Sequence, residues 1–125
     1  MHKESSVLRT TAIWTLAVVL GLLFVLVGLS KMSGPSGMSW EVRFSHWGYP
    51  VASRYVIGGI EILAGLGLLV PSFRRFAAIT LMVVMSGAFA THLIHAEFVR
   101  LLSPLILGGL SYGLYSWGPR APRKE

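Results

Sequence analysis

The chain has 125 residues, of which 54% are hydrophobic and only 13% are charged, about half the charged share of an ordinary soluble domain. So few charges cannot coat a water-soluble surface, and we therefore predict an integral membrane protein in contact with the lipid bilayer. The absence of cysteine excludes disulfides, thiolate-bound cofactors and thiol catalysis. The formal charge of +6 does not indicate nucleic-acid binding, because the basic residues separate apolar segments instead of gathering on one face.

Four apolar segments between charged residues have the length that a helix needs to cross a bilayer, at about 1.5 Å per residue. We predict transmembrane helices over residues 10–31, 51–70, 76–96 and 101–117. The fourth is the shortest. Ser103 followed by Pro104 is typical of an N-cap and first turn, so the regular part of this helix runs only from there to about Trp117. The expected fold is all-α, an antiparallel four-helix bundle in a single domain over residues 1–125.

The first segment has an alternative interpretation as a signal peptide. Lys3 and Arg9 precede it, and Gly28 and Ser30 offer small residues at a cleavage-like spacing. Its apolar run is longer than the about 7 to 15 residues of a signal-peptide core. We therefore favour a membrane helix.

The basic residues of the short connections predict the orientation, because lysine and arginine concentrate on the cytoplasmic side. Those on the side of the two termini are Lys3, Arg9, Arg74, Arg75, Arg120, Arg123 and Lys124. Those on the other side are Lys31, Arg43, Arg54 and Arg100. The larger first group places both termini in the cytoplasm, in a membrane of the bacterial inner-membrane type.

The connection from Lys31 to Pro50 is rich in aromatic residues. Trp40, Phe44 and Trp47 recur in it at helical spacing. We predict a short helix lying in the outer membrane interface, where tryptophan and tyrosine concentrate. The alternative is an irregular loop that its tryptophans anchor.

Glu61 is the most unusual residue of the apolar segments, because it lies near the middle of the predicted helix 51–70. A charge there costs about 2.5 to 3.5 kcal/mol on insertion scales, so burial favours the neutral acid unless a cation lies close by. An intramembrane acid is a functional candidate by default, and a structural hydrogen bond between helices is the alternative. Arg54, Gly58 and Gly65 share its helix face, where the glycines admit a neighbouring helix or a flat ligand.

Other polar residues are predicted at the same end of the molecule. Lys31 ends the first helix, Arg54 begins the second, and His92 lies near the outer end of the third. We therefore predict a small polar pocket in the outer leaflet, covered by the aromatic segment, with Glu61 and His92 as catalytic candidates. The substrate-binding candidates are Lys31, Arg54 and Trp47. The alternative for both cations is that they extend to the lipid headgroups.

Metal and haem sites are weaker interpretations. His92 and His95 at i, i+3 share a metal only if Glu61 and Glu97 complete the shell, and the usual zinc spacing is absent. For His95, an interfacial role beside Glu97 is the simpler expectation. Haem ligation needs histidines on facing helices, and outside the third helix only those at positions 2 and 46 remain.

Gly109 and Gly113 form a G-x-x-x-G pattern on the fourth predicted helix. The pattern permits close helix packing, either inside the bundle or between two copies of the chain. A homo-oligomer through these glycines is therefore one predicted partnership.

Taken in order, these residues resemble the DoxX family of small four-helix membrane proteins, from about Leu8 to Tyr115. The matching features are Gly28 to Lys31 at the first helix exit, Phe44 and Gly48-Tyr49-Pro50 before the second helix, Gly58 to Glu61 with Gly65, Leu68 and Leu69, the basic turn at Arg74 or Arg75, and Ala88 with His92. The resemblance marks Lys31, Glu61 and His92 as pocket residues, whereas Arg54 is placed there only by the helical stripe.

The resemblance implies a subunit or accessory protein of a membrane oxidoreductase, with a quinone as the candidate small molecule. A quinone carbonyl needs a donor such as histidine or lysine, and its reduction needs a proton source such as Glu61. The electrons would come from a partner, which argues against an autonomous enzyme. The alternatives are a proton-coupled transporter, since small multidrug transporters also combine four short helices with one buried acid, and a structural or chaperone-like membrane protein.

Overall fold

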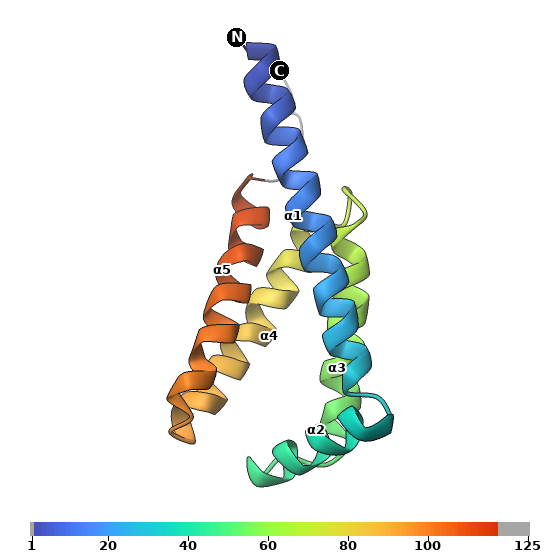
Figure 1. Cartoon of the computed structure of the whole chain (residues 1–125), viewed down its shortest axis with the longest axis vertical. Helices are drawn as coiled ribbons and strands as arrows, with labels where there is room; N and C mark the ends of the chain where they lie inside the picture. Colours follow the sequence, from blue (N-terminus) through green and yellow to red (C-terminus); the bar gives the residue numbers. More distant parts are fainter. Residues whose placement is uncertain (1, 118–125) are drawn as a thin grey trace.

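The computed structural model describes residues 2–117, with side chains for residues 4–117, and every regular element within that range is a helix. The elements in chain order (Figure 1) are α1 (His2–Ser30), α2 (Gly34–His46), α3 (Ser53–Leu68), α4 (Arg74–Ile94), the short 3-10 helix η1 (Phe98–Leu101) and α5 (Leu102–Trp117). The predicted all-α class is confirmed. The topology residues Arg120, Arg123 and Lys124, and the side chain of Lys3, lie outside the described part.

Three helical stretches are long and apolar enough to cross a membrane, namely Glu4–Ser30, Arg74–Ile94 and Phe98–Trp117. The predicted span over 51–70 is shorter in the structure, because α3 has only 16 residues. That length gives about 24 Å, against a hydrocarbon core of about 30 Å. Pro71 explains the early end, since proline disfavours helical backbone at the residue before it. The four-span bundle therefore stays a prediction, while three candidate spans are found.

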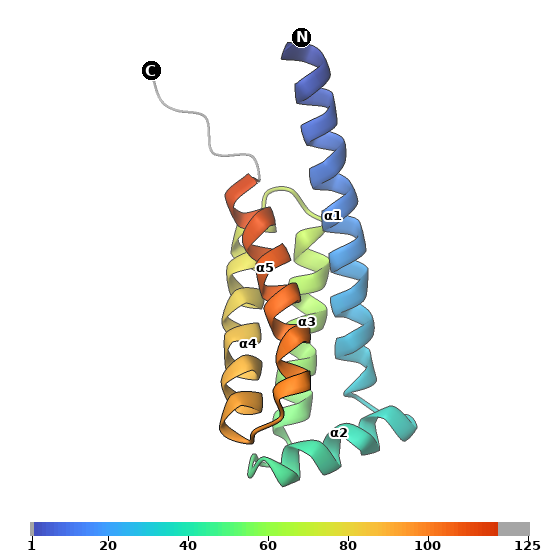
Figure 2. The ribbon, with the colours of Figure 1, turned by 60° about the vertical axis from the view of Figure 1, so that its left-hand side comes forward.

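The long helices associate as two pairs, α1 with α3 and α4 with α5 (Figures 1 and 2). Contacts of α3 with α4 and of α1 with α5 join the pairs. In Figure 1 the ribbons of the two pairs lie closer together at the α3–α4 turn than at the α2 end. Figure 2 shows α2 lying across that end and the start of α1 extending beyond the other helices.

The core lies where the two pairs meet, and it consists of small and aliphatic side chains around Phe24. The buried apolar residues are Ile13, Ala17, Leu20, Phe24, Ala64, Leu68, Ala77, Ala78, Leu81, Met85 and Leu114. Many large apolar side chains point outward instead, among them Leu63, Phe76 and Val83 at 67 to 74% exposure. A surface this apolar belongs against lipid, and the protein is therefore a membrane protein.

α1 and α3 approach one another at two pairs of glycines. A Cβ atom added to Gly28 would lie 2.5 Å from the carbonyl oxygen of Gly58, and one added to Gly65 would lie 2.7 Å from that of Gly21. No real side chain tolerates such distances, so the two backbones are in direct contact. The predicted glycine stripe therefore admits a neighbouring helix, and that helix is α1.

The aromatic segment forms the helix α2, which confirms the predicted short helix over the irregular loop. Pro35 lies in its first turn, as proline prefers. Gly34, the first residue of the helix, and Gly48, shortly after its end, adopt φ values of 75° and 86°. The ring of Phe44 is buried, with its centroid 6.1 Å from that of Trp40 and 5.4 Å from that of Trp47. The position of α2 in a membrane interface stays a prediction.

The G-x-x-x-G pattern on α5 is not used for packing within the described chain. Gly109 is exposed, and a Cβ atom added to it would meet no atom within 4 Å. One added to Gly113 would meet only the ring of Trp117, on the same helix. Self-association through this surface stays a prediction.

Candidate functional site

Glu61 and Lys31 form a buried ion pair. Glu61 lies in the middle of α3 and is 2% exposed, while Lys31 directly follows α1 and is 4% exposed. The Lys31 Nζ lies 2.7 Å from Glu61 Oε1. The predicted proximity of these two residues is thus correct, and Lys31 turns inward rather than toward the headgroups. A cation therefore lies directly beside the buried acid.

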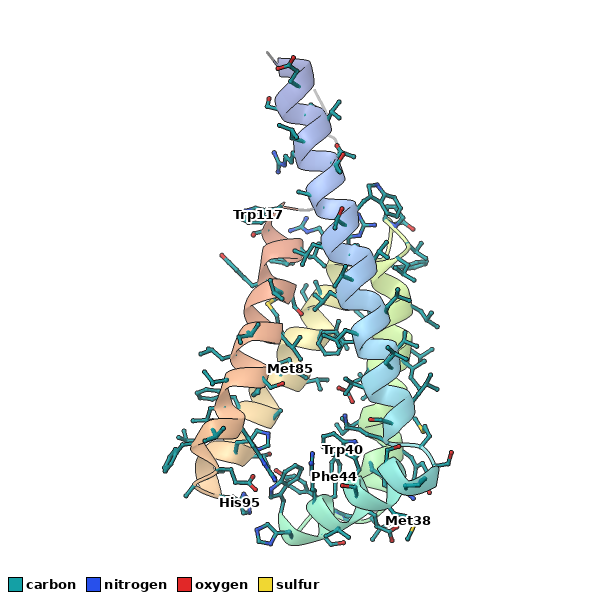
Figure 3. All side chains as sticks on the ribbon, in the orientation of Figure 1. Met38, Trp40, Phe44, Met85, His95 and Trp117 are labelled. Carbon is teal, nitrogen blue, oxygen red and sulfur yellow. The ribbon has the colours of Figure 1, made fainter. Side chains whose placement is uncertain are left out.

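The ion pair is covered by Trp40 of α2. Lys31 Nζ lies 4.0 Å from the centroid of the Trp40 ring, which is a cation–π contact. The indole Nε1 donates a hydrogen bond to Ser30 Oγ at 3.0 Å, and this bond fixes the ring over the end of α1. Figure 3 shows Trp40 and Phe44 directed from α2 toward the other helices.

Arg54 holds the end of α1 and does not extend to solvent. Its side chain is 9% exposed, and Nη1 donates to the carbonyl oxygens of Lys31 at 2.8 Å and Met32 at 3.3 Å. These carbonyls directly follow the last turn of α1, where helical partners are lacking. Nη2 lies 3.8 Å from Glu41 Oε2, a partner on α2. Arg54 therefore caps α1 and fixes the backbone that carries Lys31.

His92 belongs to a second polar cluster, which is organised by Glu97. Glu97 Oε1 accepts a hydrogen bond from Trp47 Nε1 at 2.9 Å and lies 3.0 Å from His92 Nδ1. Glu97 Oε2 accepts from Arg100 Nη1 at 2.9 Å. The rings of Trp47 and His92 meet edge to face, with centroids 5.4 Å apart. The hydrogen bond of His92, followed by those of Trp47 and the charge of Arg100, lowers the pKa of Glu97 in spite of partial burial.

The end of α4 explains why Glu97 reaches His92. The backbone N–H of Glu97 donates to the carbonyl of His92 at 2.8 Å, and that of Ala96 donates to the carbonyl of Leu93 at 3.2 Å. These two bonds form a Schellman motif, in which the residue after the helix is left-handed. Ala96 has that conformation, with φ of 56°. The turn brings Glu97 back over the last turn of α4.

The hydrogen bonds, ion pairs and ring contacts of the described residues group the predicted site residues into two clusters. The structure brings Lys31, Glu61 and Arg54 together at the α1–α3 end, and it brings His92 and Trp47 together at the α4 end. α2 joins both clusters, through Trp40 at the first and through Trp47, which directly follows the helix, at the second. His95 joins neither, since its Nδ1 lies 2.8 Å from the carbonyl oxygen of Thr91.

The sequence does not reveal the structural importance of two residues, Glu97 and Arg74. It suggests Glu97 only as a metal ligand or as an interfacial neighbour of His95. Trp40, by contrast, belongs to the aromatic segment that is expected to cover the pocket, and its ring lies over Lys31. Arg74 was considered only as a loop cation and part of the basic turn, yet it is 2% exposed. Its Nε donates to the carbonyl of Leu68 at 2.7 Å, and its guanidinium lies 4.5 Å from the ring centroid of Trp14. Nothing in the sequence distinguishes it from the exposed Arg75.

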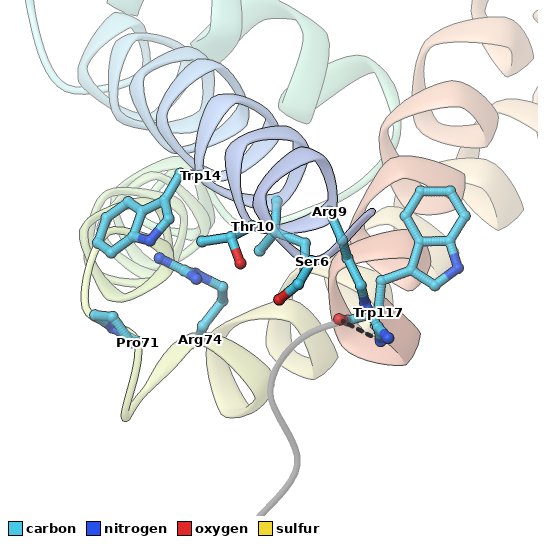
Figure 4. Close-up of a pocket in the computed structure, with 8 residues that line it drawn as sticks. Ser6, Arg9, Thr10, Trp14, Pro71, Arg74 and Trp117 are labelled. Carbon is cyan, nitrogen blue, oxygen red and sulfur yellow. Dashed lines mark hydrogen bonds between the residues drawn. The ribbon is translucent and has the colours of Figure 1, made fainter. Parts of the chain in front are cut away.

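Two cavities of the described chain lie away from these clusters. One, of about 460 Å³, opens beside Arg74 and the start of α1 (Figure 4). The other, of about 370 Å³, lies between α4 and α5 beside Met85 and Gly108. Neither is lined by a predicted site residue.

Comparison with known proteins gives one match. The sequence model described as the DoxX-like family matches residues 15–114, which cover most of the chain and include every residue of both clusters. Searches of curated proteins and of solved structures found no match.

Proposed function

Since the chain belongs to the DoxX-like family, we propose that it is a membrane subunit or accessory protein of a quinone-linked oxidoreductase system. The observation that carries the proposal is the ion pair of Lys31 and Glu61, which is buried beneath the flat ring of Trp40. A membrane protein rarely buries such charges unless they pair or serve a function. Here Lys31 extends from the end of α1 to Glu61 in the middle of α3, and Trp40 of the short helix α2 covers the pair.

The ion pair has the donors that a quinone carbonyl needs. A lysine ammonium group has three N–H donors. The carboxylate of Glu61 occupies one of the three donors of Lys31. Glu61 keeps Lys31 charged and oriented, so that another N–H can bind a carbonyl oxygen and supply a proton to it. Trp40 offers a flat face beside the ammonium group. Electrons would reach this site from a partner, because the chain has no thiol redox pair of its own.

The proposal includes the topology. We propose that α3 is a fourth span in a locally thinned bilayer and that both termini are cytoplasmic. Arg9 Nη2 donates to the carbonyl of Trp117 at 3.2 Å, which supports placing the start of α1 and the end of α5 on the same side. The α2 end then faces the outer side. Single cysteines at Ser36 and Ser72 should label from opposite sides of the membrane, and labelling from one side would contradict this topology.

The test is to extract the protein from its native membrane in mild detergent and to identify what accompanies it. We expect a redox protein and a quinone, seen by mass spectrometry and in the optical spectrum. Glu61→Gln and Lys31→Met should lose the quinone, whereas Glu4→Gln, an exposed acid on α1, should retain it. Quinone and redox proteins at the level of an unrelated membrane protein would contradict the proposal.

A second candidate function is structural, because the second cluster is already internally paired. Both carboxylate oxygens of Glu97 have partners, so this cluster joins α2 to α4 without a ligand. The double variant Lys31→Met with Glu61→Met separates the two functions. Replacing both members of a buried pair by apolar residues is often neutral for stability. A double variant that folds and keeps its biological activity favours the structural function, and one that folds without activity favours the quinone site.

A further inference from the structure

The cavity beside α1 lies at the end of the molecule opposite α2. It has a volume of about 460 Å³, and α1, the α3–α4 turn and the end of α5 surround it (Figure 4). The polar residues that line it are Ser6, Arg9, Thr10 and Arg74. Figure 4 shows Arg74 beneath Trp14 on one side of the cavity and Arg9 beside Trp117 on the other, with both hydroxyl residues between them.

The cavity contains positive charge, and none of the described residues that line it is an acid. Arg74 is buried, and its Nη2 has no hydrogen-bond partner among the described residues. Arg9 donates to the carbonyl of Trp117, a neutral group. The described ion pairs all involve Glu41, Glu61 or Glu97, and none includes either arginine. A buried cation without a counterion is unfavourable, so an anion at this position would stabilise the fold.

We propose that this cavity binds a phosphate group. Two guanidinium groups and two hydroxyl groups facing one space match the oxygen atoms of a phosphate, which arginine binds in a bidentate manner. The group comes either from the headgroup of an anionic phospholipid or from a free phosphate compound. The aromatic rim favours the lipid. Trp14, Trp117 and Phe73 are 42 to 61% exposed at this end, and exposed aromatic side chains concentrate at headgroup level.

The experiment measures thermal unfolding of the full chain, delipidated in a neutral detergent, during titration with three probes. These are short-chain phosphatidylglycerol, short-chain phosphatidylcholine of equal chain length, and inorganic phosphate. We expect phosphatidylglycerol to raise the Tm saturably and phosphatidylcholine to do so at higher concentration. A rise with inorganic phosphate as well identifies the free phosphate group as sufficient, and a rise with phosphatidylglycerol alone identifies the lipid headgroup.

Three variants test the position of the site. Arg9→Gln and Arg74→Gln should weaken the apparent affinity about fivefold or more, the factor expected for one basic side chain at an anionic surface. Arg75→Gln is the matched control, because it removes the same charge from the next residue, which is exposed and lies over the ring of Tyr115. Arg9 is exposed, so its variant keeps the test valid if Arg74→Gln does not fold. Equal affinities for Arg9→Gln and Arg75→Gln, or no saturable rise in Tm with any probe, would overturn the proposal.

Discussion

The two polar clusters beneath α2 are built in opposite ways. In the first, Lys31 and Glu61 are 5% and 2% exposed at their side chains, and one cation faces one acid. In the second, His92 and Glu97 are 13% and 19% exposed, and one acid serves three donors. The difference teaches that the first cluster depends on both partners being present, whereas the second can lose a donor to water at small cost.

Removing one member of the buried pair should have the largest effect. Glu61→Gln leaves the ammonium group of Lys31 buried without a counterion, and we expect a loss of about 3 to 5 kcal/mol in the free energy of unfolding. Denaturant titration in detergent measures this. Glu41→Gln is the control, since Glu41 is 44% exposed at its side chain and 3.8 Å from Arg54, and should change stability by about 1 kcal/mol at most. Wild-type stability of Glu61→Gln would mean that Glu61 is neutral in the folded protein.

The glycine contact that supports the first cluster should be the next most sensitive feature. In Gly58→Ala the new methyl group meets the carbonyl of Gly28, and α1 and α3 must separate. We expect a loss of about 1 to 3 kcal/mol, as for other overpacked sites. Gly59→Ala places the same group where it meets nothing within 4 Å, and should stabilise the helix by about 1 kcal/mol. The two variants would respond alike if α1 and α3 were not in backbone contact.

The second cluster can be strengthened at its turn. Ala96 is left-handed, a conformation that costs a residue with a side chain roughly 1 to 2 kcal/mol, and Ala96→Gly removes the cost at the price of a more flexible unfolded chain. We expect a net gain of at most about 1 kcal/mol, measured as a rise in Tm. Ala90→Gly, inside α4, should destabilise the protein by about 1 kcal/mol. A destabilised Ala96→Gly would show that the turn adopts another conformation in the membrane.

The smallest expected effect is the loss of the contribution of Glu97 to stability at low pH. Because hydrogen bonding lowers the pKa of Glu97 in the folded protein, its contribution to stability is complete above the ordinary value of about 4.3 and is lost as the pH falls through the lower folded value. Tryptophan fluorescence should therefore report release of Trp47 only below about pH 4. Glu97→Gln should lack this transition, and Glu41→Gln should retain it. A transition of equal size in Glu97→Gln would assign it to another group.

Much of this architecture was predictable from local patterns. Arg54, Gly58 and Glu61 are spaced so that they share one face of any α-helix, which made their common face predictable. Lys31 and Glu61 were expected at a similar depth in the membrane, which made their proximity predictable. The contacts of His92 with Glu97 and Trp47 were not predictable, because they depend on the turn after α4 and on how the α4–α5 pair is oriented against α2. The burial of Arg74 was not predictable either. Arg74 and Arg75 are the same residue type in adjacent positions, and only the packing of the α3–α4 turn makes one buried and the other exposed.

The glycine contacts between α1 and α3 also have a mechanical consequence. Two helices whose backbones touch at two heights cannot slide past each other, so α1 and α3 form one rigid body, and relative motion is confined to the boundary with α4 and α5. α2 bridges that boundary, with Trp40 bound to Ser30 on one side and Trp47 bound to Glu97 on the other. Separation of the two bodies must break one of these indole hydrogen bonds, and the two tryptophans are therefore built-in reporters of any opening beneath α2.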